Sequence, residues 1–364
     1  MAGPDELKAA RRLAAVREQM AAERLDALLV CDAVNLRWLS GYVGEGVVGL
    51  LTRRWAGLLA TFRNVQRARR QATGWDVIDL KARPKALPNE LRRRRVEALG
   101  VEASTPHAAF AQRRKALRPV RLRPSDAVRR CRAVKTPEEI DLLRRAQRRA
   151  EAVFERVLGE IRPGMTEHEL HNRIIQLILD EPDLDGPAFP PICASGPSAW
   201  ATHSYYTRRR LRANDCLILD LGVRYRGWCS DMTRTVFLGR PTRAMREVYA
   251  VVLEAQQRAI DAIRPGVRGA AVHAAAHEVL VAHGYGESMG HGLGHGIGME
   301  VHEHPAGGLG AGSKAPLREG MVLTVEPGIY LPGRFGVRIE DTVVVTPTGC
   351  EDLTRADRSI VILP

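Results

Sequence analysis

Two stretches of the sequence decide the fold: NDCLILDLG at 214–222 and EGMVLTVEPG at 319–328. In each stretch an apolar run typical of a buried strand carries one carboxylate, Asp220 or Glu326, shortly before a glycine turn. The two stretches therefore look like copies of one structural unit within a single chain.

The repetition extends on both sides of these strands. Upstream, IRPGM at 161–165 recurs as IRPGV at 263–267, and each copy follows one helical pattern and precedes another. Downstream, each strand is followed across a hairpin by a second strand pattern with another acid, Asp231 in CSDMTRT and Glu340 in VRIEDT. Two similar halves that face each other would bring all four carboxylates together.

Four carboxylates inside strands require compensation. An unpaired carboxylate in an apolar run costs several kcal/mol of folding free energy or is neutralised by a shifted pKa. Pairing with arginines such as Arg234 and Arg338 would solve the problem for a single acid. Four acids at matching places favour a metal site instead. Oxygen-rich ligation suits Mn²⁺ or Co²⁺, and the six scattered cysteines form no CxxC pair for a structural zinc site.

A glycine- and histidine-rich segment, GHGLGHGIGMEVHE at 290–303, lies between the second acid and the third. No offset within it fits the GxGxxG phosphate-loop pattern. Its glycines indicate close backbone approach around a ligand-bearing strand. Likewise SGPSAW at 195–200 lacks the second glycine of a GxSxG elbow, so a serine hydrolase is not supported.

The 364 residues suggest two domains. A helical pattern followed by short apolar runs indicates an α/β region at the N-terminus, whereas the Arg-, Pro- and Ala-rich stretch 81–130 has weak periodicity and no element is assigned to it. A new helix begins with a capping box from Thr136 to Glu139, which places the domain boundary near residue 132. The expected N-terminal elements are a helix over 5–24 and strands over 27–31, 46–51 and 55–61.

The chain is basic, with 55 Lys and Arg against 42 Asp and Glu and a net charge of +13. Aromatic residues make up only 5% of the chain, so few side chains are available to stack on bases. We interpret the arginines as solvated helix faces and expect no specific nucleic-acid partner. No apolar run is long enough for a membrane span and no signal-peptide pattern is present, so a cytoplasmic protein is expected.

These residues resemble the pita-bread metallopeptidases, the group of aminopeptidase P, prolidase and methionine aminopeptidase. The resemblance covers 134–364, and the segment before it, including NLRWLSGY at 35–42, resembles the creatinase-type N-terminal domain of aminopeptidase P and prolidase. It implies an α/β N-terminal domain over 1–132 and an α+β pita-bread catalytic domain with an internal pseudo-twofold repeat over 133–364. The matching ligand positions are Asp220, Asp231, His295 in HGIGMEVHE, Glu326 in TVEPGIY and Glu340 in VRIED.

The resemblance implies a site with two divalent metal ions, Mn²⁺ before Co²⁺, Fe²⁺ or Zn²⁺. Asp231 and Glu340 would bridge the ions, Asp220 would complete one, and His295 and Glu326 would complete the other. Two such ions can hold a bridging water and lower its pKa from about 15.7 towards about 7, which gives a bridging hydroxide.

Further residues match the family's catalytic positions. Glu326 would also carry the water's proton to the leaving nitrogen. His203 and His302 would hydrogen-bond the substrate carbonyl or the tetrahedral intermediate. Arg338 would orient nearby carboxylates, and the role of His291 stays open.

The implied function is hydrolysis of an Xaa-Pro peptide bond by an Xaa-Pro aminopeptidase or a dipeptidase of the prolidase type. The expected partners are a peptide with proline at its second position and a second copy of the chain in a homodimer. Two alternatives stay open: a hydrolase of a small non-peptide amide with the same fold, and a non-catalytic pita-bread binding module. Relatives that work without metal have lost ligands, whereas all five positions are filled here.

Overall fold

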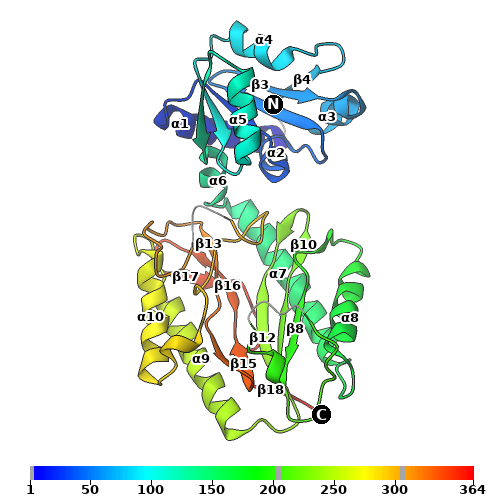
Figure 1. The fold of residues 1–364 in the computed structure, drawn as a ribbon, viewed down its shortest axis with the longest axis vertical. Coiled ribbons are helices and arrows are strands. Elements are labelled where there is room, and N and C mark those ends of the chain that lie inside the picture. Colours follow the sequence, from blue (N-terminus) through cyan, green and yellow to red (C-terminus); the bar gives the residue numbers. More distant parts are fainter. Residues whose placement is uncertain (1–3, 202–205, 304–307) are drawn as a thin grey trace. The chain divides into compact units, whose positions relative to one another are not determined.

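The computed structural model describes residues 4–201, 206–303 and 308–364. The chain divides into two compact units, Met1–Arg132 and Ala133–Pro364, each with its own sheets and helices (Figure 1). Among the described helices, none combines the length and the apolar character that crossing a membrane would require.

The first unit is a six-stranded sheet in the order β4-β3-β2-β1-β5-β6. Its apolar core joins strand residues such as Leu29 and Leu50 to Leu91 and Leu117 from the α4 and α5 regions, while α1 packs with α2 and α6. The strands are β1 Ala27–Val30, β2 Val47–Thr52, β3 Ala56–Ala60, β4 Asp76–Asp79, β5 Ala98–Glu102 and β6 Arg121–Ser125. The helices are α1 Pro4–Ala22, α2 Ala33–Ser40, α3 Val65–Gln71, α4 Ala86–Arg93, α5 His107–Ala116 and α6 Ala127–Arg132.

The expected helix and strands at the start of this unit are confirmed by α1, β1, β2 and β3. The stretch 81–130, to which no element was assigned, forms α4, β5, α5, β6 and most of α6. Tertiary contacts explain the difference. A Cβ on Gly100 in β5, for example, would lie 2.6 Å from Leu25 Cδ1. Close packing therefore requires a glycine here, although glycine is not typical of a strand sequence.

The second unit contains two helix pairs and several short sheets. The helices are α7 Pro137–Leu158, α8 Glu167–Leu179, α9 Arg243–Ala262 and α10 Gly269–Ala282. The sheets are β18-β12-β9-β8, β13-β16-β17, β11-β10-β7 and β14-β15. The strands are β7 Gly186–Pro187, β8 Ile192–Ser195, β9 Cys216–Leu221, β10 Val223–Tyr225, β11 Trp228–Cys229, β12 Met232–Leu238, β13 Val322–Val325, β14 Gly328–Leu331, β15 Phe335–Arg338, β16 Asp341–Val345, β17 Cys350–Asp352 and β18 Val361–Leu363.

The predicted capping box begins α7. Thr136 N–H donates to Glu139 Oε2 at 3.0 Å, and Glu139 N–H donates back to Thr136 Oγ1 at 3.4 Å. Two N–H groups at the helix start thereby gain hydrogen-bond acceptors, which is the reason this helix starts where the sequence indicates.

The internal repeat is visible in backbone hydrogen bonds. In the first copy, Gly164 N–H donates to Leu211 O at 2.8 Å; in the second, Gly266 N–H donates to Leu317 O at 2.9 Å. The return bonds also match, because Leu211 N–H donates to Met165 O at 2.7 Å and Leu317 N–H donates to Val267 O at 2.8 Å. The turn between α7 and α8 and the turn between α9 and α10 are thus held by the same pattern of hydrogen bonds.

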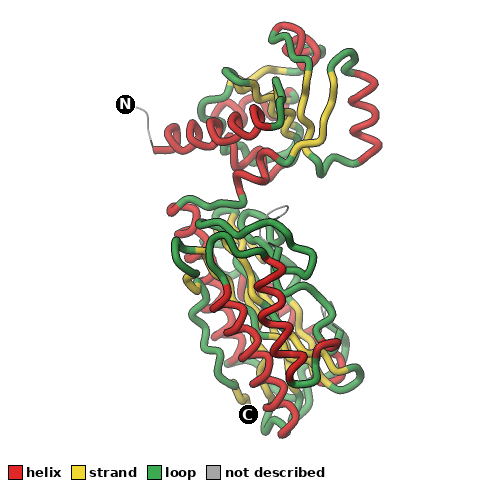
Figure 2. The backbone as a smooth tube through the Cα atoms, turned by 90° about the vertical axis from the view of Figure 1, so that its left-hand side faces the viewer, coloured by secondary structure: helices red, strands yellow, loops and turns green. Residues whose placement is uncertain are grey.

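Each helix pair covers one half of the unit. α7 and α8 pack in one apolar cluster with residues of β9 and β12, and α9 and α10 pack in another with residues of β13, β15 and β16. In Figure 1 the pairs flank the strands on opposite sides, and in Figure 2 the helices form a layer along the strands. Of the four acids, Asp220 lies within a strand, whereas Asp231, Glu326 and Glu340 directly precede or follow one.

Candidate metal centre

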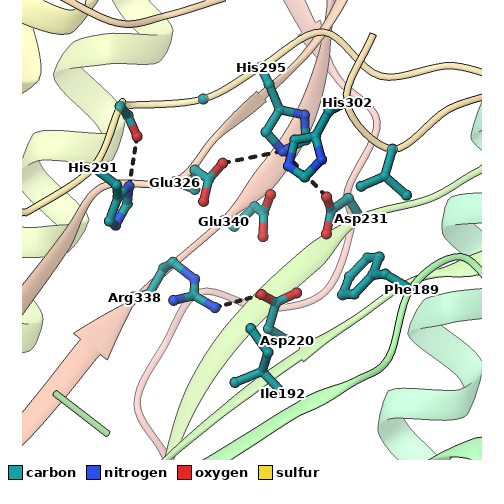
Figure 3. A pocket seen from close by; sticks show the side chains of 13 residues that line it. Phe189, Ile192, Asp220, Asp231, His291, His295, His302, Glu326, Arg338 and Glu340 are labelled. Atoms are coloured by element: carbon teal, nitrogen blue, oxygen red, sulfur yellow. Dashed lines mark hydrogen bonds and ion pairs between the residues drawn. The ribbon is translucent and has the colours of Figure 1, made fainter. Parts of the chain in front are cut away.

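A cavity of about 310 Å³ lies where the two halves of the second unit meet (Figure 3). Its apolar wall includes Phe189, Ile192 and Val301. Its charged and titratable lining consists of Asp220, Asp231, His291, His295, His302, Glu326, Arg338 and Glu340. All five positions that match the family's metal ligands therefore face one cavity.

Thr233 joins the two halves at the acids. Asp220 on β9 pairs in register with Thr233 on β12, and Glu340, just before β16, forms a bridge with the same Thr233. Thr233 Oγ1 donates to Glu340 Oε2 at 2.7 Å. Asp231, just before β12, is held from the other half because its carbonyl accepts a hydrogen bond of 3.0 Å from Thr342 Oγ1. Strand pairing thus brings together acids that are over one hundred residues apart in sequence.

The glycine-rich segment runs beside β13. Thr324 N–H donates to His295 O at 2.9 Å, and Glu326 N–H donates to Leu293 O at 2.8 Å. A Cβ on Gly294 would lie 2.0 Å from Thr324 O, so only glycine permits this approach. The pairing directs the His295 side chain towards Glu326, with 3.4 Å between Nε2 and Oε1.

Three of the candidate ligands already form a compact donor set. One donor atom from each of Asp231, His295 and Glu340 lies within 4.8 Å of the other two. His295 Nε2 lies 3.6 Å from Asp231 Oδ2. One imidazole and two carboxylates are donors that Mn²⁺, Fe²⁺, Co²⁺ and Zn²⁺ accept.

The acids are costly to ionise together. Burial, followed by repulsion from Glu340, Asp220 and Glu326, raises the pKa of Asp231 well above its ordinary value. Burial and repulsion from Glu326 and Asp220 raise the pKa of Glu340 in the same way. Burial raises the pKa of Glu326 to about 7, although Arg338 opposes the shift. The pKa values therefore indicate a site with too little positive charge.

The residues fit a bound cation. Asp220 Oδ1 and Glu340 Oε1 are buried and have no hydrogen-bond partner among the described residues. The described lining of the cavity has four carboxylates and one guanidinium, that of Arg338. Buried carboxylates without partners are expected where a cation balances their charge.

Arg338 neutralises part of the negative charge of the acids. The sequence analysis named it as a possible partner of a single buried acid, and it pairs with Asp220. Its Nη2 donates to Asp220 Oδ2 at 2.5 Å and its Nε donates to Thr233 Oγ1 at 3.1 Å. Its Nη1 donates to Tyr330 Oη at 3.0 Å, and that oxygen lies 2.8 Å from His291 Nε2. Arg234, in contrast, pairs with Asp341 and with none of the four acids in the described structure.

His302 and His203 are the two histidines predicted to contact the substrate. His302 lines the cavity, and its ring centroid lies 4.1 Å from that of His295. His203 lies outside the described residues. Tyr330 was not singled out from the sequence, because a tyrosine in a strand gives no sign that its hydroxyl joins Arg338 to His291.

Comparison with known proteins agrees with this architecture. Residues 141–347 match metallopeptidase family M24, and residues 12–134 match the creatinase/prolidase N-terminal domain. An Xaa-Pro dipeptidase of Pyrococcus furiosus is 35% identical over 236 residues, which are 65% of this chain and 67% of that protein. The structure of an Xaa-Pro dipeptidase from Bacillus anthracis has a TM-score of 0.92 at 33% identity and covers 98% of this chain and 100% of its own. An X-Pro aminopeptidase from Thermotoga maritima has a TM-score of 0.85 at 32% identity, with 94% and 100% covered. These similarities confirm the pita-bread fold class predicted from the sequence motifs.

Proposed function

The chain belongs to metallopeptidase family M24, and from that premise we propose that it is an Xaa-Pro peptidase with two divalent metal ions in the cavity. The observation that carries the proposal is the set of four carboxylates that surround one cavity together with His295. Two of these carboxylates have a buried oxygen that no group in the described part of the chain hydrogen-bonds. Xaa-Pro dipeptidases and an X-Pro aminopeptidase among its similar proteins support the bond that is cleaved.

Asp231 and Glu340 would be shared by the two ions. Asp220 would hold one ion, and His295 and Glu326 the other. Divalent ions held there supply Lewis-acid polarisation of the scissile carbonyl and favour deprotonation of water at neutral pH. We propose Mn²⁺ as the resident ion, since three or more oxygen donors outnumber one imidazole.

Side chains of the cavity would transfer the proton and bind the substrate. Glu326 would accept, on a carboxylate oxygen, the proton that the attacking water loses, and would deliver it to the proline nitrogen as the peptide bond breaks. His302, in the cavity wall, donates a hydrogen bond to the carbonyl oxygen as negative charge develops on it. Arg338 holds Asp220 in place through the 2.5 Å bond.

The apolar wall would receive the substrate's side chains. Phe189, Ile192 and Val301 line the cavity and offer apolar surface to a proline ring. Figure 3 shows Phe189 and Ile192 beside Asp220. Excluding water from this side strengthens the electrostatic contacts on the other.

The residues that follow VHE at 301–303 bear on the length of the peptide substrate. In prolidase-like members an arginine past the VHE-type motif can pair with the free carboxylate of a dipeptide. Here the sequence continues VHEHPA at 301–306, so that cation is missing at the matching place. A lost charged hydrogen bond is worth roughly 1.5 to 3 kcal/mol, or one to two decades of specificity. We therefore propose an aminopeptidase acting on peptides longer than two residues.

The experiment compares kcat/KM for Ala-Pro with that for Ala-Pro-Ala, and uses Ala-Ala-Ala as the control without proline. Cleavage of Ala-Pro-Ala at least tenfold better than Ala-Pro supports the proposal. A clear preference for Ala-Pro would refute the length argument, and equal cleavage of Ala-Ala-Ala would refute the Xaa-Pro assignment. Size-exclusion chromatography with light scattering tests the proposed homodimer, and fractionation of the source cells tests the proposed cytoplasmic location.

A further inference from the structure

A buried ion pair lies beside the catalytic cavity without lining it. Lys135 Nζ is 3.0 Å from Glu303 Oε2, and their side chains are only 1% and 6% exposed. The two residues are 168 positions apart in sequence. Burying a lysine and a glutamate costs desolvation free energy, which their mutual attraction and further hydrogen bonds must offset.

The Glu303 side chain lies inside the turn that connects His295 to His302, two of the histidines that line the cavity. Its Oε1 accepts a 2.9 Å hydrogen bond from Met299 N–H, and its own N–H donates to Gly296 O at 2.7 Å. A Cβ on Gly298 would lie 2.5 Å from Glu303 Oε1, so the backbone wraps closely around the carboxylate. The shape of segment 296–303 therefore depends on where this carboxylate is held.

Lys135 is tied to the strand layer that carries the acids. Its N–H donates to Gly320 O at 2.8 Å, and the preceding Val134 forms an antiparallel bridge with Met321. Met321 immediately precedes β13, after which comes Glu326. Lys135 Nζ also donates to Ala133 O at 3.4 Å. The ammonium group is thus fixed relative to the candidate metal ligands.

We infer that Lys135 is a positioning residue that acts through Glu303 to set the place of His302 in the cavity. His302 is the residue next to Glu303, so a shift of the carboxylate moves the histidine directly. Removing Lys135 takes away the ammonium group 3.0 Å from a buried carboxylate, and the resulting desolvation cost is relieved when the turn opens towards water. A displacement of about 1 Å at a group that contacts the reacting atoms can cost about 100-fold in rate. The inference rests on the proposed function, because His302 is assigned there to the substrate carbonyl.

The test uses the full-length, Mn²⁺-loaded protein in four variants. Lys135→Met removes the charge, Lys135→Arg keeps it, and Glu303→Gln removes the partner's charge while keeping an acceptor for Met299 N–H. Arg94→Met is the matched control, since Arg94 Nε pairs with Glu90 Oε2 at 3.1 Å in the first unit, with side chains 19% and 11% exposed. The readouts are kcat and KM on Ala-Pro-Ala, bound metal, and hydrogen exchange of the peptide spanning 294–303.

Lys135→Met should lower kcat about 10- to 100-fold, with KM and bound metal within about twofold of wild type, because His302 acts on the carbonyl as charge develops. Lys135→Arg should recover most of the loss, and Glu303→Gln should fall between the two. Exchange at 294–303 should quicken in Lys135→Met and stay unchanged in Arg94→Met. If Lys135→Met does not fold, Glu303→Gln and Lys135→Arg carry the same comparison.

Three results would overturn the inference. These are wild-type kcat in Lys135→Met, loss of bound metal in step with activity, and unchanged exchange at 294–303. A wild-type protein that cleaves no Xaa-Pro peptide would refute the proposed function instead, and the exchange measurement would still decide whether Lys135 holds this turn.

Discussion

Replacing Glu326 by glutamine should stabilise the metal-free protein at alkaline pH although it abolishes activity. Burial raises the pKa of Glu326 to about 7 from an ordinary 4.5. At 1.36 kcal/mol for each tenfold change in proton affinity, the ionised carboxylate opposes folding by about 3 kcal/mol. Glutamine fills the same volume and can still accept the bond that Thr324 Oγ1 donates at 3.2 Å, without this cost.

The pH dependence follows from the direction of the shift. Because the folded-state pKa is the higher one, the cost is absent below about pH 4.5, grows as the pH rises, and is complete above about pH 7. In EDTA at pH 8 the Glu326→Gln variant should therefore unfold about 6 to 12 °C above wild type, at roughly 2 to 4 °C per kcal/mol for a unit of this size. At pH 4.5 the two proteins should unfold together.

Saturating Mn²⁺ should reverse the order, since only wild type offers the ionised ligand. Differential scanning calorimetry of the second unit's transition, with and without metal, measures all of these effects. Equal stabilities in EDTA at pH 8, or a less stable variant, would refute the claim that this carboxylate is held in an unfavourable environment until a cation balances it.

Three further predictions concern the shared carboxylates, the two histidines assigned to the substrate, and the basic charge of the first unit. Asp231→Asn or Glu340→Gln should reduce turnover by at least about 10³-fold and lower bound metal, because each is proposed to be shared by both ions; elemental analysis and far-UV circular dichroism check metal and fold, and near-normal turnover would exclude a bridging role. His302→Ala and His203→Ala should reduce kcat by about 10²-fold with metal content retained, as expected for groups that stabilise the developing oxyanion; metal loss in step with activity would contradict the assignment. Residues 1–132 carry 28 Lys and Arg against 13 Asp and Glu, whereas the rest of the chain carries 27 against 29, so the entire basic excess belongs to the first unit. Electrostatic binding of nucleic acid would therefore involve the first unit. Because aromatic residues that could stack on bases make up only 5% of the chain, we expect this binding to be weak, independent of sequence and lost as salt rises to 200 mM, and tight saturable binding at physiological salt would contradict the expectation.

The repeat was the strongest signal in the sequence. IRPG occurs twice because two turns make the same pair of hydrogen bonds to a leucine that lies a few residues before an acid-bearing strand, for example Gly164 to Leu211 and Gly266 to Leu317. Carboxylates in apolar strands are also readable without a structure, since their burial cost demands a partner. For that reason the acids that line the cavity could be named beforehand.

Other features depend on contacts that leave no local pattern. The ion pair of Lys135 and Glu303 joins residues 168 apart, and neither flanking sequence shows why the other is needed. The strand Ala98–Glu102 and the helices around it were missed because their pattern is set by packing against Leu25, β1 and one another. Which acid receives Arg338 was equally undetermined, because that depends on how β15 lies beside β9.

The most direct test of the metal-dependent peptidase is a titration of the EDTA-stripped protein with Mn²⁺, in which bound metal and the rate of Ala-Pro-Ala cleavage are measured on the same samples. The five proposed ligands, with Asp231 and Glu340 shared, predict no cleavage without metal and a rate that reaches its plateau near two ions per chain. Full activity in the EDTA-stripped protein, or a cleavage rate that does not change as Mn²⁺ binds, would contradict the account.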